Sequence, residues 1–246
     1  MKKSGIHIVL LAIFPLLLFS ACNDDEGYSQ SKQWEALATV YPTSETAYYL
    51  VLDDGATLGV SDSGVNYRPK ANQRVYVNFT LLNNTGNYDY YAKINWISEI
   101  LTKSVVNLIP ENEDSIGNDP VKIHSLWLGD NYLNVYFGFN SGNQKTHFIN
   151  LVNNTAIVRP DSSKIYLEFR HNANGDPEWY PSNGFVAFDL RPYKAAWQEL
   201  QDSIDLVIDV KDFNNEHKTY TRTYKFGTAE SHALTYGSTN DATLFR

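Results

Sequence analysis

The chain has 246 residues, of which 43% are hydrophobic and 20% charged, and its formal net charge is −8 at pH 7. A chain of this length forms one large domain or two small ones. The negative charge, without a stripe of lysine and arginine, argues against nucleic acid as a partner, because phosphate binding needs a basic surface.

The first 21 residues have the parts of a bacterial export signal. Two lysines precede an apolar stretch over residues 6–19, and two small residues stand directly before Cys22. The apolar stretch is shorter than the roughly 20 residues that cross a bilayer as a helix. We therefore expect residues 1–21 to be removed as a signal peptide.

Cys22 is the only cysteine, so an intramolecular disulfide is impossible. Its setting resembles a lipobox, in which the cysteine is acylated after cleavage. Three acyl chains would anchor the protein permanently, because each buried methylene adds about 0.8 kcal/mol. This predicts a membrane lipoprotein anchored through Cys22; the alternative is an ordinary secretory signal that leaves a free thiol.

Residues 22–33 are polar and acidic and are predicted to form a tether between the lipid and the folded body. Asp24, Asp25 and Glu26 resemble the acidic signal that directs many lipoproteins through the outer membrane. This predicts an outer-membrane lipoprotein that faces the cell surface. The alternative is a solvated linker without a sorting role.

Residues 34–109 are predicted to form a small OB-type β-barrel. The chain contains 17 tyrosines and 5 tryptophans, which suit pleated surfaces better than helix interiors. Residues 74–82 alternate apolar and polar side chains, as in a strand with one buried face. Asp53-Asp54-Gly55 predicts a hairpin turn, because glycine tolerates a positive φ. Five strands are expected, at residues 38–41, 47–53, 57–60, 74–82 and 88–100.

Residues 110–120 are polar, contain Gly117 and end in a proline, which predicts an interdomain linker. Residues 121–228 are then expected to form a seven-stranded antiparallel β-sandwich. Residues 193–201 have helical spacing, and residues 229–246 form a polar tail. The seven strands are expected at residues 121–128, 132–139, 146–152, 164–171, 184–190, 203–212 and 218–226.

Several segments, in their order and spacing, resemble the NigD-like lipoproteins. They include residues 52–55, 127–134, 147–152 and 167–172. The resemblance runs from about Trp34 to Phe226 and implies an N-terminal OB-type barrel followed by a C-terminal β-sandwich. The family takes its name from a gene neighbourhood linked to bacteriocin production, and the resemblance implies neither an activity nor a ligand.

Two groups of residues are candidate binding sites. The first combines charge with aromatic surface at a strand end and the following loop. Its alternative explanation is that Glu168 and Arg170 simply pair with each other. The second surrounds residues 129–131, with a packed hairpin as the alternative. The candidates are Glu168, Arg170, His171, Trp179 and Tyr180 in the first group, and Trp127 and Tyr132 in the second.

The sequence has no signature of a catalytic or cofactor site. The six histidines are far apart in the chain, which does not favour a metal site, and no nucleophile elbow or phosphate-binding loop is present. A pair of carboxylates for glycoside hydrolysis stays open, because such a pair needs no sequence motif.

We therefore predict a non-enzymatic surface module, without a cofactor or metal, that binds a glycan, a peptide or an envelope protein. One alternative is a bacteriocin-associated accessory or immunity lipoprotein. A second alternative is a polysaccharide hydrolase.

Overall fold

The computed structural model describes residues 32–83, 86–157, 159 and 161–226. The predicted signal peptide, Cys22, the acidic residues 24–26, nearly all of the tether and the C-terminal tail lie outside these residues. Within them, neither helix is long and apolar enough to cross a bilayer.

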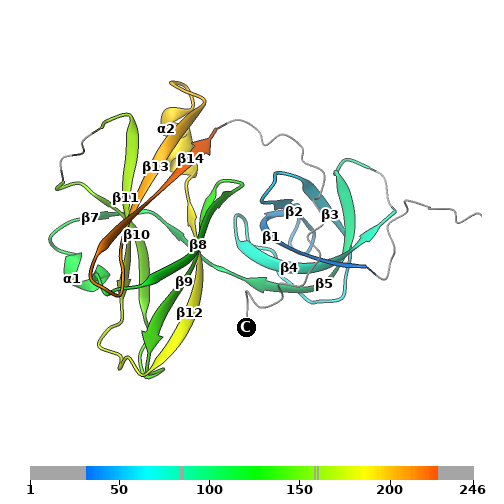
Figure 1. Cartoon of the computed structure of the whole chain (residues 1–246). Coiled ribbons are helices and arrows are strands. Elements are labelled where there is room, and N and C mark those ends of the chain that lie inside the picture. Colours follow the sequence, from blue (N-terminus) through cyan, green and yellow to red (C-terminus); the bar gives the residue numbers. More distant parts are fainter. Residues whose placement is uncertain (1–31, 84–85, 158, 160, 227–246) are drawn as a thin grey trace, which may run out of the picture.

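The N-terminal unit is a closed five-stranded barrel, as predicted (Figure 1). Its strands follow each other around the barrel in the order β1-β2-β3-β5-β4, and β3 and β5 are parallel neighbours. The bounds of the strands are β1 Gln33–Pro42, β2 Tyr48–Leu52, β3 Thr57–Ser63, β4 Arg74–Leu82 and β5 Tyr90–Glu99.

The alternation in β4 fills the barrel interior, which confirms the periodicity argument. Val75, Val77, Phe79 and Leu81 are all buried in the barrel core. The predicted hairpin between β2 and β3 is also present, and Gly55 at its turn has a φ of 90°. A side chain at that position would strain the backbone.

The C-terminal unit is a β-sandwich of two sheets, shown in green to orange in Figure 1. One sheet has the order β14-β13-β11-β10-β7 and the other β6-β12-β9-β8. The strands are β6 Leu101–Ser104, β7 Val106–Leu108, β8 Lys122–Gly129, β9 Tyr132–Ser141, β10 Phe148–Asn154, β11 Lys164–Asn172, β12 Tyr180–Asp189, β13 Ser203–Lys211 and β14 His217–Lys225.

All seven strands predicted for this unit are present, and their inward faces form its core. Leu133, Val135 and Phe137 of β9 pack in one cluster with the apolar residues of β13. The sheets are mixed rather than wholly antiparallel, because β7, β6 and β13 each run parallel to a neighbour. The predicted helix begins earlier than expected, as α2 at Arg191–Trp197.

The structure moves the boundary between the units from residues 110–120 to the segment after Glu99. Strands β6 and β7 lie within the predicted barrel segment, yet they are the edge strands of the two sandwich sheets. Both are short and pair in parallel with strands far along the chain, so they leave little local periodicity. The expected linker instead carries α1 (Glu113–Ile116), whose Ile116 packs against Leu108 and Val152.

Candidate functional site

Arg74 forms the centre of a polar network between the two units. Its side chain is fully buried and forms an ion pair with Asp53 of the barrel. It also donates hydrogen bonds to Thr39 Oγ1 at 3.0 Å and to Asn134 Oδ1 of the sandwich at 3.2 Å. A buried guanidinium needs such partners, because an unpaired buried charge is very costly.

The sandwich completes this network through residues 127–134. Trp127 Nε1 and Asn134 Nδ2 donate to Asp53 Oδ2 at 3.1 and 3.2 Å. Thr39 Oγ1 donates to Asp130 Oδ2 at 2.9 Å. We call Arg74, Asp53, Thr39, Asp130, Trp127 and Asn134 the interdomain network.

The interdomain network explains the second group of candidate residues. Trp127 binds Asp53, whereas Tyr132 is buried and donates its hydroxyl to Asn72 O at 2.8 Å. Both side chains therefore hold the two units together. A Cβ added at Gly129 would lie 2.1 Å from Asp53 Cγ, so only glycine allows this close approach.

The structure places the residues of the first group on different surfaces. Arg170 and Glu168 form an ion pair with each other on one face of β11, as the alternative explanation proposed. His171 points to the opposite face and is buried, because successive side chains of a strand alternate. Trp179 and Tyr180 are each 60% exposed and lie edge to face, with ring centroids 6.5 Å apart.

His171 belongs to a second buried polar cluster at one end of the sandwich. His171 Nε2 and His147 Nδ1 are 2.8 Å apart, and His147 Nε2 is 3.1 Å from Asp176 Oδ2. Asp176 also accepts hydrogen bonds from Ser141 and from three backbone N–H groups in the loop that follows Ser141. We call His147, His171, Asp176 and Ser141 the histidine cluster.

The charges of the histidine cluster follow from burial and hydrogen bonding. Burial, reinforced by the neighbouring His147, lowers the pKa of His171 to about 4. Burial opposes ionisation of Asp176, but hydrogen bonds from Ser141, His147 and the backbone outweigh it and lower the pKa of that carboxyl. Ser141 donates to Asp176 and not to a histidine, so the cluster lacks the nucleophile–base contact of a catalytic triad.

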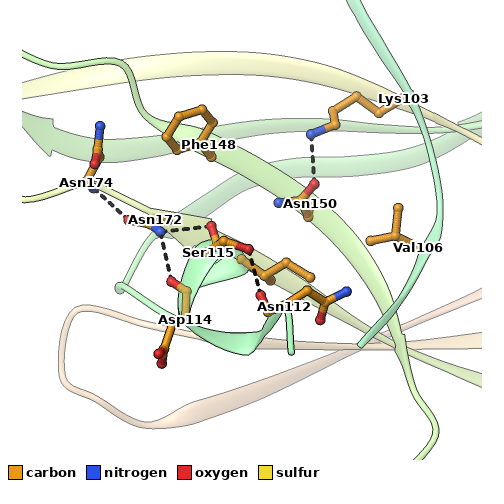
Figure 2. Close-up of a pocket in the computed structure, with 10 residues that line it drawn as sticks. Lys103, Val106, Asn112, Asp114, Ser115, Phe148, Asn150, Asn172 and Asn174 are labelled. Carbon is orange, nitrogen blue, oxygen red and sulfur yellow. Dashed lines mark hydrogen bonds between the residues drawn. The ribbon is translucent and has the colours of Figure 1, made fainter. Parts of the chain in front are cut away.

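A groove lies on the outer face of the β10–β11 sheet (Figure 2). It has a volume of about 740 Å³ and lies between α1, β10 and the β6–β7 segment. We call it the asparagine groove; it is lined by Lys103, Val106, Asn112, Asp114, Ser115, Ile116, Phe148, Asn150, Asn172 and Asn174.

Phe148 gives the asparagine groove an exposed aromatic surface. Ile149 and Leu151 of β10 point into the core, so the alternation of the strand turns Phe148 and Asn150 outward. Phe148 is 45% exposed, and Val106 across the groove is 36% exposed. Ligand sites typically combine exposed apolar surface with a few polar groups, as this groove does.

Side-chain amides hold the walls of the asparagine groove in place. Asn172 Nδ2 donates to Ser115 O at 2.9 Å and to Asp114 O at 3.2 Å, which ties α1 to β11. Lys103 Nζ donates to Ile149 O and to Asn150 Oδ1, both at 2.7 Å, and so bridges the two sheets. These hydrogen bonds hold the walls of the groove in place without a ligand.

The barrel carries a row of tyrosines that contact one another through their rings. The rings of Tyr41 and Tyr49 stack with their centroids 5.2 Å apart and an interplanar angle of 14°. The ring centroids of Tyr49 and Tyr88 are 5.1 Å apart. Their faces are thus turned toward one another. Phe148 and the Trp179–Tyr180 pair offer more open aromatic surface.

No group of three or more histidine, cysteine, aspartate or glutamate side chains that could hold a metal ion occurs among the described residues.

Comparison with known proteins decides the family. Residues 37–100 match the NigD-like N-terminal OB domain, and residues 104–224 match the NigD-like C-terminal beta sandwich domain. The chain belongs to the NigD-like family. The two matched regions meet at residues 100–104, where the chain of this NigD-like protein passes from the barrel into the sandwich.

Solved structures similar to the NigD-like chain come from Parabacteroides and Bacteroides species. A toxin-related protein from Parabacteroides distasonis is 38% identical, with a TM-score of 0.69, over 80% of this chain and 96% of that one. A NigD-like immunity protein from Bacteroides caccae is 22% identical, with a TM-score of 0.61, over 78% and 96%. None of the curated proteins compared with the chain matches it.

Sequence reasoning missed the asparagine groove because its lining comes from separate segments. Lys103 and Val106 lie on edge strands that were not predicted, and α1 lies in the supposed linker. One signal was available: Phe148 and Asn150 occupy the outward positions of an alternating strand, where a large apolar side chain is unexpected.

Proposed function

We propose that this NigD-like protein is a lipid-anchored envelope protein that binds a carbohydrate in the asparagine groove without cleaving it. One observation carries the proposal: Phe148, 45% exposed, stands in a hollow of about 740 Å³ whose lining also contains four asparagine side chains. The apolar face of a sugar ring packs on an aromatic ring, while amides donate to and accept from its hydroxyls.

The charged residues of the asparagine groove favour binding over hydrolysis. Glycoside hydrolysis uses two carboxyl groups, roughly 5–10 Å apart, on either side of the scissile bond. Asp114 is the only carboxylate among the ten residues that line this groove. A sugar held there would meet one acid without its partner.

The proposed location rests on the N-terminal sequence and on the family. Cys22 follows an export signal, and acylation of this residue would anchor the body through a short acidic segment. A protein from Bacteroides fragilis that shares the fold, at 12% identity, is described as a lipoprotein. We place the protein on the outer membrane, facing the cell surface, because the acidic residues 24–26 resemble a surface-export signal.

Glycan-array binding of the chain and two variants tests the proposal. Phe148→Ala should weaken binding by about tenfold or more, because removing an aromatic anchor from a binding site costs roughly 2 kcal/mol. Trp179→Ala is the matched control, since it removes another exposed aromatic ring outside the groove. Loss of binding in Trp179→Ala alone would move the site to the Trp179–Tyr180 pair and refute the groove.

A second candidate function is bacteriocin-associated accessory activity or immunity. The names of the similar proteins from Parabacteroides distasonis and Bacteroides caccae favour it. It predicts that the anchored chain protects cells from a toxin and captures that toxin with no glycan signal. Protection that survives Phe148→Ala would separate this function from carbohydrate binding.

A further inference from the structure

Lys103 is the only cation among the ten residues that line the asparagine groove. It lies on β6, the edge strand of one sheet, and its side chain reaches across to β10 of the other sheet. Figure 2 shows its amine beside Asn150, on the same side of the groove as Phe148. A ligand stacked on Phe148 would therefore lie close to a positive charge.

The amine of Lys103 has one more donor than it has acceptors in the described part of the chain. An ammonium group has three N–H donors. Two of them bind Ile149 O and Asn150 Oδ1, each at 2.7 Å. No carboxylate is paired with Lys103 among the described residues, whereas other lysines such as Lys70 form ion pairs there.

The environment of Lys103 would favour an incoming negative charge. Burial lowers the pKa of Lys103, because removing water destabilises its charged form. An anion placed beside the amine would restore that stabilisation. In a partly buried site the resulting hydrogen bond would be charge-assisted and stronger than a neutral one.

The geometry beside Lys103 suits a carboxylate. Asn150 Oδ1 accepts from Lys103, so Asn150 Nδ2 lies next to the ammonium and presents its own N–H donors. Two neighbouring donors match the two oxygens of a carboxylate. The one acid of the groove, Asp114, lies on α1 at the opposite side (Figure 2), so it does not occupy this position.

We propose that the ligand of the asparagine groove is an acidic glycan, whose uronate carboxylate binds Lys103 and Asn150 while its ring stacks on Phe148. This inference rests on the proposed carbohydrate binding and names the class of sugar. It also fixes an orientation, with the carboxylate at the β6 side and neutral hydroxyls toward α1.

Titration of the detergent-solubilised full chain with uronate oligosaccharides tests the inference. Galacturonate, glucuronate and mannuronate oligomers are each compared with their methyl esters, which keep the ring and remove the charge. At least one acid should bind about tenfold more tightly than its ester, as expected for one charge-assisted hydrogen bond. Lys103→Met should abolish this preference, and Lys103→Arg should keep it.

Lys164→Met is the control, because it removes another lysine of the sandwich, on β11 and outside the groove, and it should leave the preference unchanged. Acids and esters that bind equally, or a preference that survives Lys103→Met, would overturn the acidic-glycan inference and leave carbohydrate binding intact. Binding of no saccharide at all, charged or neutral, would overturn both proposals.

Discussion

The interdomain network and the asparagine groove are both rich in polar side chains, but they differ in how those side chains are satisfied. In the interdomain network Arg74 is fully buried, and its two terminal nitrogens bind Asp53, Thr39 and Asn134, while its Nε is enclosed without a partner among the described residues. In the groove, one N–H donor of Lys103 has no partner among the described residues, and neither does the amide nitrogen of Asn150. The first arrangement holds two protein units together, whereas the second leaves hydrogen-bonding capacity for a ligand.

This difference separates structural polar residues from candidate binding residues. Buried polar groups are almost always hydrogen-bonded within the protein, so polarity alone indicates no function. Trp127 and Tyr132 looked like a binding surface in the sequence, yet their polar atoms bind Asp53 and Asn72. Donors left over in an open hollow are the more informative signal.

Asp53→Ala should produce the largest effect, because it leaves the Arg74 guanidinium buried without its charged partner. We expect the free energy of unfolding to fall by about 3–5 kcal/mol in chemical denaturation. Lys70→Ala is the control: its ion pair with Glu99 is exposed and should contribute at most about 1 kcal/mol. Equal decreases in the free energy of unfolding of the two variants would mean that the interdomain network stabilises the fold no more than an exposed ion pair.

The histidine cluster should make the fold sensitive to acid. His171 has a pKa of about 4 in the folded protein and about 6.5 when unfolded, so the unfolded chain binds more protons between these values. The free energy of unfolding should therefore decrease as pH falls, by roughly 2–3 kcal/mol between pH 7 and pH 4.5.

Denaturation of His171→Gln across this pH range measures that contribution. The variant should lose less stability than the parent chain between pH 7 and pH 4.5. NMR titration of the parent should show that His171 stays neutral until pH falls to about 4. Protonation of His171 near its ordinary pKa would contradict the prediction.

Gly129→Ala should have a smaller effect on the interdomain network. The new Cβ would overlap the Asp53 carboxylate, which must shift away from Trp127 and Arg74. Overpacking of this kind costs about 1–3 kcal/mol, measured as a shift in the denaturation midpoint. Gly64→Ala is the matched control, because its new Cβ would lie 3.4 Å from the carbonyl oxygen of Ile94, an ordinary contact distance. Equal stability of the Gly129 and Gly64 variants would show that the Asp53 carboxylate can move away from residue 129 at little cost.

The strands of both units could be predicted because each has a local signature. The alternation in Arg74–Leu82 and the turn at Gly55 act within a few residues, and both were confirmed. Strands β6 and β7 have only four and three residues, and their partners lie on β12 and β10. Their place depends on long-range pairing, which a local pattern does not carry.

The candidate site was less predictable because it depends on side-chain direction and on distant contacts. Glu168, Arg170 and His171 are neighbours in sequence, but alternation sends His171 into the histidine cluster. The asparagine groove joins Lys103, Asp114 and Phe148, which come from three separate segments. The resemblance to the NigD-like family correctly gave the fold, but the segments that carry it lie partly in the interdomain network and say little about a ligand.

The contact through Arg74 also limits the relative motion of the two domains, and therefore the conformational entropy that ligand binding can remove. Two domains joined by a loose hinge must give up their relative motion if a ligand or surface fixes them, and that loss weakens association. Here Asp53 of the barrel accepts hydrogen bonds from Trp127 and Asn134 of the sandwich, and Arg74 donates a buried hydrogen bond to Asn134. These hydrogen bonds restrain the sandwich, which carries the groove, against the barrel, so recognition has less motion between the two units to remove.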